Sequence, residues 1–238
     1  AGSITLGVGQ FCTNPGIMVA IESEGLNEFL SALGHEIKNI APGKMLHAGI
    51  AKSYHQKKSR ALTQENVSVV ASAAVPNEEL AASAIIATTN AETFINNPLL
   101  QHEVFGPYSI IVRCKNANEM LQVAKQLEGQ LTCTLMTTEN ELKDNEELVE
   151  QLKNICGRII LNGVPTGVEV CLSMQHGGPF PASSDSRFTS VGADGIKRFA
   201  RPIAFQNWSN SLLPDELKNE NPLNIYRTVN NELSKEKI

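Results

Sequence analysis

The stretch 108-YSIIVRC-114 decides the fold of this chain. Its run of apolar and β-branched residues predicts a strand that is buried on both faces. Asn116 can cap a helix after it, and the runs 131-LTCTLMT-137 and 158-RIILN-162 predict two more strands, with a second helix at 144–156 between them. Strands that alternate with helices through short connections predict right-handed crossovers within one parallel sheet. The predicted fold class is therefore α/β, with a mainly parallel, twisted sheet flanked by helices.

The residues ahead of this stretch continue the same pattern. Short β-rich runs at 17–22, 67–75 and 83–89 predict strands, the second of them at an edge of the sheet. Apolar residues at helical spacing predict helices at 26–40 and 47–62. These elements give the sheet further strands and further helical cover.

The composition of the chain changes after the strand predicted at 158–162. The segment 164–186 is rich in Pro, Gly and Ser, and loops of this length usually carry function or are mobile. One more strand is predicted at 203–208 and a helix at 226–232. Because the residues after Trp208 are mostly polar, we expect one domain at 1–208 and an extended C-terminal surface tail at 209–238.

Composition excludes several classes of protein. The 238 residues carry 20 Lys+Arg and 25 Asp+Glu, a formal net charge of −5, and 42% of them are hydrophobic. That much apolar material is enough for a core and argues against general disorder. Scattered basic residues argue against a nucleic-acid partner, and no apolar run approaches the roughly 18 residues of a membrane span. Five cysteines without CxxC spacing predict reduced thiols and a cytoplasmic location, and five scattered histidines predict no metal site.

One cysteine lies where a nucleophile is expected. Cys12 falls in 9-GQFCTNPG-16, a tight loop directly ahead of the strand predicted at 17–22. Such a loop can present a sulfur and a backbone N–H to a cleft, as a nucleophile requires. A buried, inert thiol is the commoner role of a cysteine. That role is assigned to the cysteines in or beside apolar runs or at a helix end: Cys114, Cys133, Cys156 and Cys171.

Two other segments contain reactive side chains. In 102-HEVFGP-107, Glu103 precedes the buried strand, and by itself this segment is typical of a turn with a solvated carboxylate. The segment 176-HGGPFP-181 is similar to the oxyanion strand of esterases, but the chain has no GxSxG nucleophile elbow. We therefore expect the histidines at the surface or hydrogen-bonded in the core, and none has an obvious claim to a place beside Cys12.

Taken together, two of these motifs resemble the aldehyde dehydrogenase superfamily. The residues 9-GQFC-12, then Pro15-Gly16 and much later 103-EVFGP-107, occur in that family's order and at about its spacing. The strand–helix alternation after Pro107 is similar to the catalytic domain of those enzymes, so the resemblance covers 1–208.

Within that family, the C-terminal segments are most similar to the α-ketoglutaric semialdehyde dehydrogenases and related NADP-dependent aldehyde dehydrogenases. The segments that carry this likeness are 178-GPFPASS-184, 189-TSVG-192 and 198-RFARP-202. They depart from the commoner Pro-Phe-Gly-Gly loop of the superfamily, which puts substrate assignments from its other branches in doubt.

The resemblance implies a reaction and roles for particular residues. The Cys12 thiolate would attack the aldehyde carbon, with its own backbone N–H holding part of the oxyanion charge. Hydride transfer to NAD or NADP would then leave a thioester, which water hydrolyses to the carboxylic acid. Glu103 is implied to bind the nicotinamide ribose, and Phe105 to pack beside the nicotinamide. The implied lining of the aldehyde pocket comprises Phe11, Phe180, Ser184 and Arg187, with Ser184 or Arg187 contacting a substrate carboxylate.

The resemblance also implies residues outside this chain. In the family, the nucleotide-binding domain, the water-activating glutamate and the oxyanion-hole asparagine precede the nucleophile. The apolar start 1-AGSITLGVG-9 predicts a further segment ahead of Ala1, although removal of an initiator Met is the alternative. We therefore expect no NAD(P)-linked turnover from these residues alone, and a homo-oligomer for the complete enzyme. The choice between NAD and NADP and the identity of the aldehyde stay open.

Two other functions stay open as well. A cysteine-dependent acyltransferase or esterase would use Cys12 without any nucleotide, and a base is then expected near the sulfur. A non-catalytic, stable fragment would have no activated thiol, and iodoacetamide would then alkylate Cys12 no faster than the other cysteines.

Overall fold

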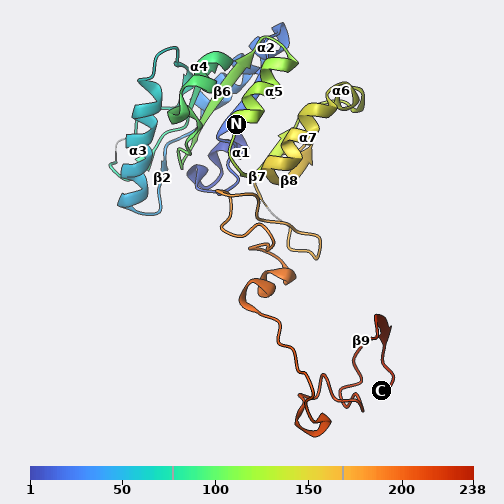
Figure 1. Ribbon diagram of the computed structural model, residues 1–238. Coiled ribbons are helices and arrows are strands. Elements are labelled where there is room, and N and C mark those ends of the chain that lie inside the picture. Colours follow the sequence, from blue (N-terminus) through green and yellow to red (C-terminus); the bar gives the residue numbers. More distant parts are fainter. Residues whose placement is uncertain (77, 168) are drawn as a thin grey trace. The chain divides into compact units, whose positions relative to one another are not determined.

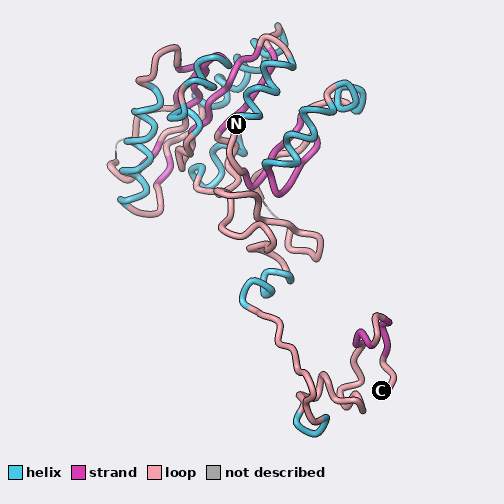
Figure 2. The backbone as a smooth tube through the Cα atoms, viewed as in Figure 1, coloured by secondary structure: helices cyan, strands magenta, loops and turns pink. Residues whose placement is uncertain are grey.

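The computed structural model describes residues 1–76, 78–167 and 169–238, which form two compact units, Ala1–Arg198 and Phe199–Ile238 (Figure 1, Figure 2). The functional boundary expected after Trp208 stays a prediction.

The first unit alternates helices and strands, and the predicted α/β class is confirmed. Its strands are β1 (Ile17–Ile21), β2 (Gly43–Lys44), β3 (Ser68–Ser72), β4 (Ala81–Ala82), β5 (Ile85–Asn90), β6 (Tyr108–Cys114), β7 (Gln130–Leu135) and β8 (Cys156–Leu161). Its helices are α1 (Gly2–Thr5), α2 (Glu24–Lys38), α3 (Ala48–Leu62), α4 (Ala91–Asn96), α5 (Ala117–Gln126), α6 (Glu139–Asp144) and α7 (Glu146–Ile155), with the 3-10 helices η1 (Leu6–Gly9) and η2 (Pro98–Gln101); a third, η3 (Ala193–Phe199), runs up to the second unit.

The central sheet has four strands in the order β1-β6-β5-β3. β6 is an interior strand and runs parallel to both of its neighbours, β1 and β5. β3 pairs antiparallel with β5 and forms an edge, as its sequence predicts. The stretch 108–114 therefore lies at the centre of the sheet.

Alternate residues of β6 enter two different cores. Ile110 and Val112 pack with the buried side chains of α3 and α4, including Tyr54 and Phe94. Ile111, which points to the opposite face, packs with the apolar side chains of α2. This alternation is the period of two that a strand requires. Helices therefore cover both faces of the sheet (Figure 1).

The single parallel sheet expected from 108–114, 131–137 and 158–162 is wrong. β7 and β8 pair in parallel with each other, in a separate two-stranded sheet. The physical reason is that β1 and β5 already occupy both edges of β6, so the strand after α5 cannot pair with it. A small core between α5 and α7 covers this second sheet, with Leu121, Leu148 and Leu152 buried.

The helix before β8 ends earlier than expected. α7 ends at Ile155 and the strand starts directly at Cys156, whose backbone is extended. Gly157 is therefore a strand residue and does not end the helix. Sequence analysis also did not predict α4 or α6; Asn90 and Thr138 cap these two short helices.

The second unit contains η4 (Asn210–Leu212) and a hairpin of β9 (Arg227–Val229) and β10 (Glu232–Ser234). The helix predicted at 226–232 is wrong, because Asn230 and Asn231 both adopt positive φ, 50° and 70°, as the central residues of a tight hairpin turn do. The strand predicted at 203–208 is also absent from this described segment, where Asn207 breaks the extended backbone with a φ of 55°.

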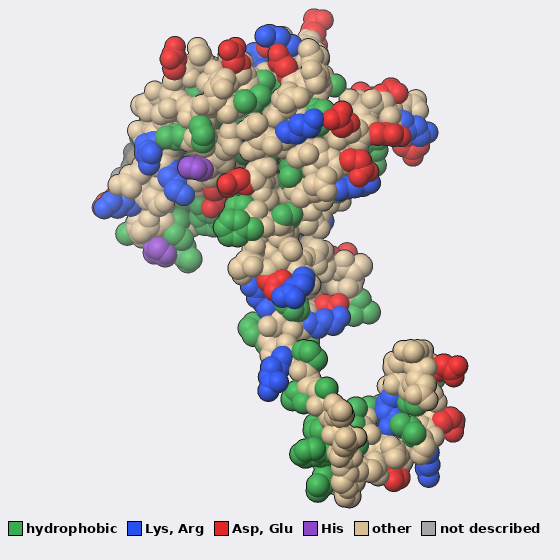
Figure 3. All heavy atoms as spheres, in the orientation of Figure 1, with side chains coloured by type: hydrophobic (Ala, Val, Ile, Leu, Met, Phe, Trp, Pro, Cys, Tyr) green, Lys and Arg blue, Asp and Glu red, His purple; other side chains and the backbone are tan. Residues whose placement is uncertain are grey.

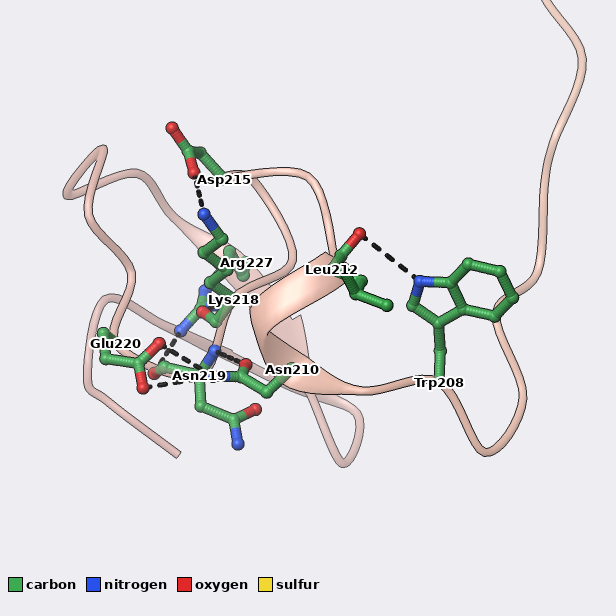
Figure 4. A network of polar contacts seen from close by, with 8 residues as sticks. All are labelled: Trp208, Asn210, Leu212, Asp215, Lys218, Asn219, Glu220 and Arg227. Atoms are coloured by element: carbon green, nitrogen blue, oxygen red, sulfur yellow. Dashed lines mark hydrogen bonds and ion pairs between the residues drawn. The ribbon is translucent and has the colours of Figure 1, made fainter.

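Polar contacts hold the second unit together. Asn210 donates to the carboxylate of Glu220 at 3.1 Å and accepts from the backbone of Asn219 at 2.8 Å (Figure 4). Arg227 donates to the carbonyl of Lys218. Many apolar side chains of this unit stay at the surface, as Figure 3 shows, among them Phe199, Trp208, Leu212 and Leu233. Among the described residues, no helix has the length and apolar character needed to cross a bilayer.

Candidate functional site

Cys12 lies in a tight turn between η1 and β1. Gly7 and Gly9 have φ values of 55° and 66°, which turn the chain sharply ahead of the cysteine. The backbone N–H of Asn14 donates to the carbonyl of Phe11 at 3.0 Å and closes the turn. Cys12 itself is exposed. The turn therefore presents this residue at the start of β1, as the sequence predicts for a nucleophile.

The segment around Glu103 lies at the same edge of the sheet. β1 and β6 are parallel neighbours, with Ile17 opposite Ile110, so the loops that lead into them meet. Their backbones touch, because a Cβ on Gly9 would overlap the peptide group of Gly106. The structure thus brings together the two motifs that lie about ninety residues apart in the sequence.

Glu103 and Phe105 occupy different environments in this loop. The side chain of Glu103 is exposed, and its carboxylate has no hydrogen bond or ion pair with the residues that the structure describes. Its backbone carbonyl accepts from Nζ of Lys57 at 3.1 Å, which fixes the loop. Phe105 is half-buried. A free carboxylate of this kind can accept hydrogen bonds from the hydroxyl groups of a ligand.

His176 is the functional residue that sequence reasoning missed. Its Nε2 lies 3.2 Å from Sγ of Cys12. His176 is buried and hydrogen-bonded, which is one of the two placements expected for the histidines, but its place beside the thiol was not expected. The chain separation of 164 residues hid the contact. The signal that could have found it is the Gly177-Gly178 pair, which permits close backbone packing directly after the histidine.

The backbone around His176 is held on both sides. Its N–H donates to Oγ1 of Thr189 at 2.8 Å, and its carbonyl accepts from the backbone N–H of Ser190 at 2.9 Å. On the other side, a Cβ on Gly157 would overlap the carbonyl of Gly177, so β8 and this loop are in backbone contact. His176 is thereby fixed by residues from two distant parts of the sequence.

The environment of the His176 imidazole favours its neutral form. The residue is only 9% exposed, and its burial, together with the positive charge of Arg158, lowers the pKa of His176 below its ordinary value. Arg158 donates to the carbonyl of Pro165 at 2.9 Å and has no carboxylate partner among the described residues. A neutral imidazole at hydrogen-bond distance can accept the proton of the Cys12 thiol.

Gly157→Ala is expected to displace the His176 segment. The added methyl group would overlap backbone atoms, which cannot move as a flexible side chain can. We expect the free energy of unfolding to fall by about 1–3 kcal/mol, the usual cost of overpacking, and alkylation of Cys12 to slow. Urea unfolding and the rate of reaction with iodoacetamide measure the two effects.

The matched control for this substitution is Gly25→Ala in α2. Its Cβ would lie 3.9 Å from Oγ of Ser23, an ordinary contact. If Gly157→Ala behaved like this control in both measurements, the contact between β8 and the His176 loop would not position the histidine.

The four residues expected to line the aldehyde pocket lie on two loops. Phe11 is adjacent to Cys12, and its ring lies against Gly7. Phe180 follows the His176 segment and is 82% exposed. Oγ of Ser184 accepts from Arg198 at 2.7 Å. Of these residues, Phe11 lies beside the thiol because it is the neighbour of Cys12 in the sequence.

Arg187 is already paired. Nε and Nη2 of Arg187 donate to the two oxygens of Asp185 at 2.9 and 2.6 Å, and these bonds lower the pKa of Asp185 to about 2. The Arg187 side chain also lines a cavity of about 190 Å³ together with Gln175, Thr189 and Lys197. Gln175 directly precedes His176 in the sequence, whereas His176 and Cys12 are not among the described residues that line this cavity.

The remaining cysteines differ in burial. Cys114 and Cys156 are buried and Cys133 is half-buried, which fits an inert role. Cys171 is exposed, so the buried role expected for it is wrong. In the described part of the chain, no group of three or more His, Cys, Asp and Glu side chains is placed to hold a metal ion.

Comparison with known proteins gives a consistent result. Residues 1–200 match the family described as "Aldehyde dehydrogenase family". The chain is 43% identical over 98% of its length to an alpha-ketoglutaric semialdehyde dehydrogenase of Acinetobacter baylyi, and 41% identical over 94% to alpha-ketoglutaric semialdehyde dehydrogenase 2 of Azospirillum brasilense. It spans 44% and 43% of the lengths of those relatives.

The fold is similar to solved structures at low sequence identity. The delta-pyrroline-5-carboxylate dehydrogenase of Mycobacterium tuberculosis superposes with a TM-score of 0.69 at 13% identity, over 89% of this chain and 41% of that one. Proline utilization A of Bdellovibrio bacteriovorus gives a TM-score of 0.70 at 20% identity, over 85% of this chain and 21% of that one. With the matched residues, the two motifs and this fold in agreement, the chain belongs to the aldehyde dehydrogenase family.

Proposed function

We propose that this chain supplies the catalytic thiol of an NAD(P)-dependent aldehyde dehydrogenase, with Cys12 as the nucleophile. The observation that carries the proposal is the 3.2 Å contact between Sγ of Cys12 and Nε2 of His176. It places a base beside an exposed sulfur, at the edge of the sheet where the loop of Glu103 also lies. Family membership supports aldehydes as the substrates.

The first step is attack of the thiolate on the aldehyde carbon. His176 accepts the thiol proton, and the sulfur forms a bond to the carbonyl carbon while the carbonyl π electrons move to oxygen. The backbone N–H of Cys12 supports the oxyanion. The resulting thiohemiacetal is then oxidised to a thioester on Cys12, which water hydrolyses to the acid.

The residues around Glu103 fit a nicotinamide nucleotide. The carboxylate of Glu103 is exposed and without a partner among the described residues, so it is free to accept from ribose hydroxyls. Phe105 is half-buried two residues further on and offers an apolar edge. NAD or NADP, when bound, supplies the acceptor for the hydride that leaves the thiohemiacetal.

The substrate proposed is an aldehyde that also carries a carboxylate. Arg187 and Lys197 line the cavity of about 190 Å³ together with Asp194, which pairs with Lys197 at 2.9 Å. A carboxylate is the natural partner of such cations. Both curated relatives are named for α-ketoglutaric semialdehyde, a substrate of this class. Binding of the carboxylate would require Arg187 to turn from Asp185, with which it pairs at 2.6 Å.

Arg187→Ala is expected to raise KM for a carboxylate-bearing semialdehyde about tenfold, the loss that one charge-assisted hydrogen bond corresponds to. KM for an uncharged aldehyde of the same length should stay within about a factor of two, because it makes no such bond. Steady-state kinetics of the complete dehydrogenase measure both constants. An equal change in the two KM values would remove Arg187 from the site.

A cysteine-dependent esterase is the second candidate function, and the same contact favours it. The base that such an enzyme needs is present, because His176 lies 3.2 Å from the sulfur. This reaction would acylate Cys12 directly from an ester and would need no nucleotide. Hydrolysis of an activated ester by the chain alone, lost in Cys12→Ala, would support it.

The experiment that tests the proposed nucleophile uses the chain without nucleotide. A reversible thiohemiacetal on Cys12 should protect this thiol from iodoacetamide when an aldehyde is added. Cys171, the other exposed thiol, serves as the control within the same molecule. Peptide mass spectrometry reports both reactions, and equal protection of the two thiols, or of neither, would contradict the proposal.

Three further points belong to the proposal. We expect residues 1–238 alone to give no NAD(P)-linked turnover, because the family resemblance assigns the nucleotide-binding domain to residues outside them. The complete enzyme is expected to form a homo-oligomer in the cytoplasm. A normal rate of NADH or NADPH production by the isolated chain would contradict the first point.

A further inference from the structure

We propose that the side chain of Asn14 is a positioning residue that ties the Cys12 loop to the Glu103 loop. The consequence for chemistry rests on the function proposed above. The hydrogen bond of the Asn14 side chain would fix the thiol relative to the Glu103 carboxylate, which is proposed to bind the nucleotide. The reacting carbon would then stay aligned with the hydride acceptor.

The tie is made at one carbonyl group. Nδ2 of Asn14 donates to the carbonyl of Gly106 at 3.1 Å. The same oxygen accepts, at 2.8 Å, from the backbone N–H of Tyr108, and Tyr108 is the first residue of β6. Asn14 thereby reaches from the turn around Cys12 to the loop that carries Glu103, two elements that are 92 residues apart in the chain at the point of contact.

Gly106 is itself held firmly from the other side. The ring of Tyr54, which is fully buried, lies where a Cβ of Gly106 would be. The Tyr54 hydroxyl donates to the carbonyl of Ser83 at 2.7 Å and so fixes the ring. The Gly106 carbonyl is therefore an immobile acceptor, and the amide of Asn14 transmits its position to the turn.

The turn around Cys12 does not need the Asn14 side chain to close. The backbone N–H of Asn14 donates to Phe11, and its carbonyl accepts from the N–H of Gly16 at 2.8 Å. Both bonds use backbone atoms only and would persist in Asn14→Ala and Asn14→Asp. The side chain thus serves the contact with Gly106, even though Oδ1 of Asn14 is buried without a partner among the described residues, an arrangement that is costly in a protein interior.

Hydrogen–deuterium exchange of the 238-residue chain tests the tie. In Asn14→Ala, the amides of 11–16 and of 106–110 should both exchange faster, by about threefold to tenfold, as loss of one hydrogen bond predicts. Within 106–110, the N–H groups of Tyr108 and Ile110 are hydrogen-bonded to Gly106 and Gly16. Asn14→Asp, which has the same shape but no donor, should do the same. Gln151→Ala is the matched control, since it removes an amide-to-carbonyl bond between α7 and α5 and should leave both segments unchanged.

Faster exchange confined to 11–16, or in neither segment, would overturn the tie. If the variants did not fold, the unsubstituted chain still decides: the two segments should open together, with the same dependence of exchange on denaturant. Independent opening would be contrary to the proposal.

Kinetics of the complete dehydrogenase add the functional test. Asn14→Ala should lower kcat by about tenfold or more, because the thiohemiacetal would be misplaced relative to the hydride acceptor. Aldehyde protection of Cys12 from iodoacetamide should persist, because attack of the sulfur on the aldehyde does not depend on that placement. If the aldehyde did not protect Cys12 in the unsubstituted chain, the proposed role of Cys12 as nucleophile would be wrong, but the exchange result would be unaffected. The two failures are thus distinguishable.

Discussion

Cys12→Ala is expected to abolish aldehyde oxidation, lowering kcat/KM by about 10⁴-fold or more, the scale of losing a covalent nucleophile. Alanine cannot form the bond to the aldehyde carbon, so neither the thiohemiacetal nor the thioester is available. The stability of the protein should change little, because Cys12 is exposed and its Sγ makes a single hydrogen bond, with His176, among the described residues. Kinetics of NAD(P)H production and a thermal melt measure the two properties.

Cys171→Ala is the matched control for this substitution, since Cys171 is the other exposed cysteine of the chain. Its activity should stay within about a factor of two of the unsubstituted enzyme, as is usual for a surface change away from the site. Comparable activity in Cys12→Ala and Cys171→Ala would contradict a covalent mechanism through Cys12.

The sequence predicts the elements of this site where the signal is local. Cys12 and Glu103 each stand in a short motif directly ahead of a strand, and the strands 17–22 and 108–114 were both predicted. Their parallel pairing then brings the two loops together without further information. Local turn chemistry and strand patterning therefore account for this half of the site.

The other half depends on packing that no local pattern shows. His176 lies within the Pro-, Gly- and Ser-rich segment 164–186, and its approach to Cys12 is set by backbone contact between Gly157 and Gly177. Predicting that contact requires knowing that β7 pairs with β8 and not with β6. The wrong prediction of one parallel sheet and the failure to predict His176 beside Cys12 thus have the same cause. Both depend on the spatial order of the strands, which the local sequence does not show.

The prediction for the second unit was wrong for a different reason. The apolar positions at 226–232 are compatible with a helix, but two consecutive asparagines adopt left-handed conformations and make a hairpin. Asparagine tolerates this conformation better than most residues, so Asn230-Asn231 was a turn signal that competed with the helical spacing. Turn chemistry decided the outcome.

His176→Asn is expected to slow alkylation of Cys12 by about tenfold to a hundredfold at neutral pH, the lower range for loss of a general base. Asparagine keeps a polar group of similar size but cannot take the thiol proton. Only the thiolate reacts, so removal of the group that takes the thiol proton slows the reaction. Iodoacetamide kinetics followed by peptide mass spectrometry measure the rate.

The direction of the pH dependence follows from the environment of His176. Because burial and Arg158 lower the pKa of His176, the imidazole stays neutral, and able to accept a proton, to a pH below its ordinary value near 6.5. The acid limb of Cys12 alkylation in the unsubstituted chain should therefore lie below about pH 6.5, the side on which His176 becomes protonated.

The same lowered pKa predicts a stability effect that separates the two roles of this residue. In the unfolded chain the histidine binds its proton at a higher pH than in the folded one, so stability is present above about pH 6.5 and falls as the pH drops through that value. His176→Asn should lack this loss, whereas His35→Asn, at an exposed position of α2, should retain it along with normal alkylation. If His176→Asn removed the acid destabilisation but alkylated like the unsubstituted chain at every pH, the histidine would be a buried structural group and not the base.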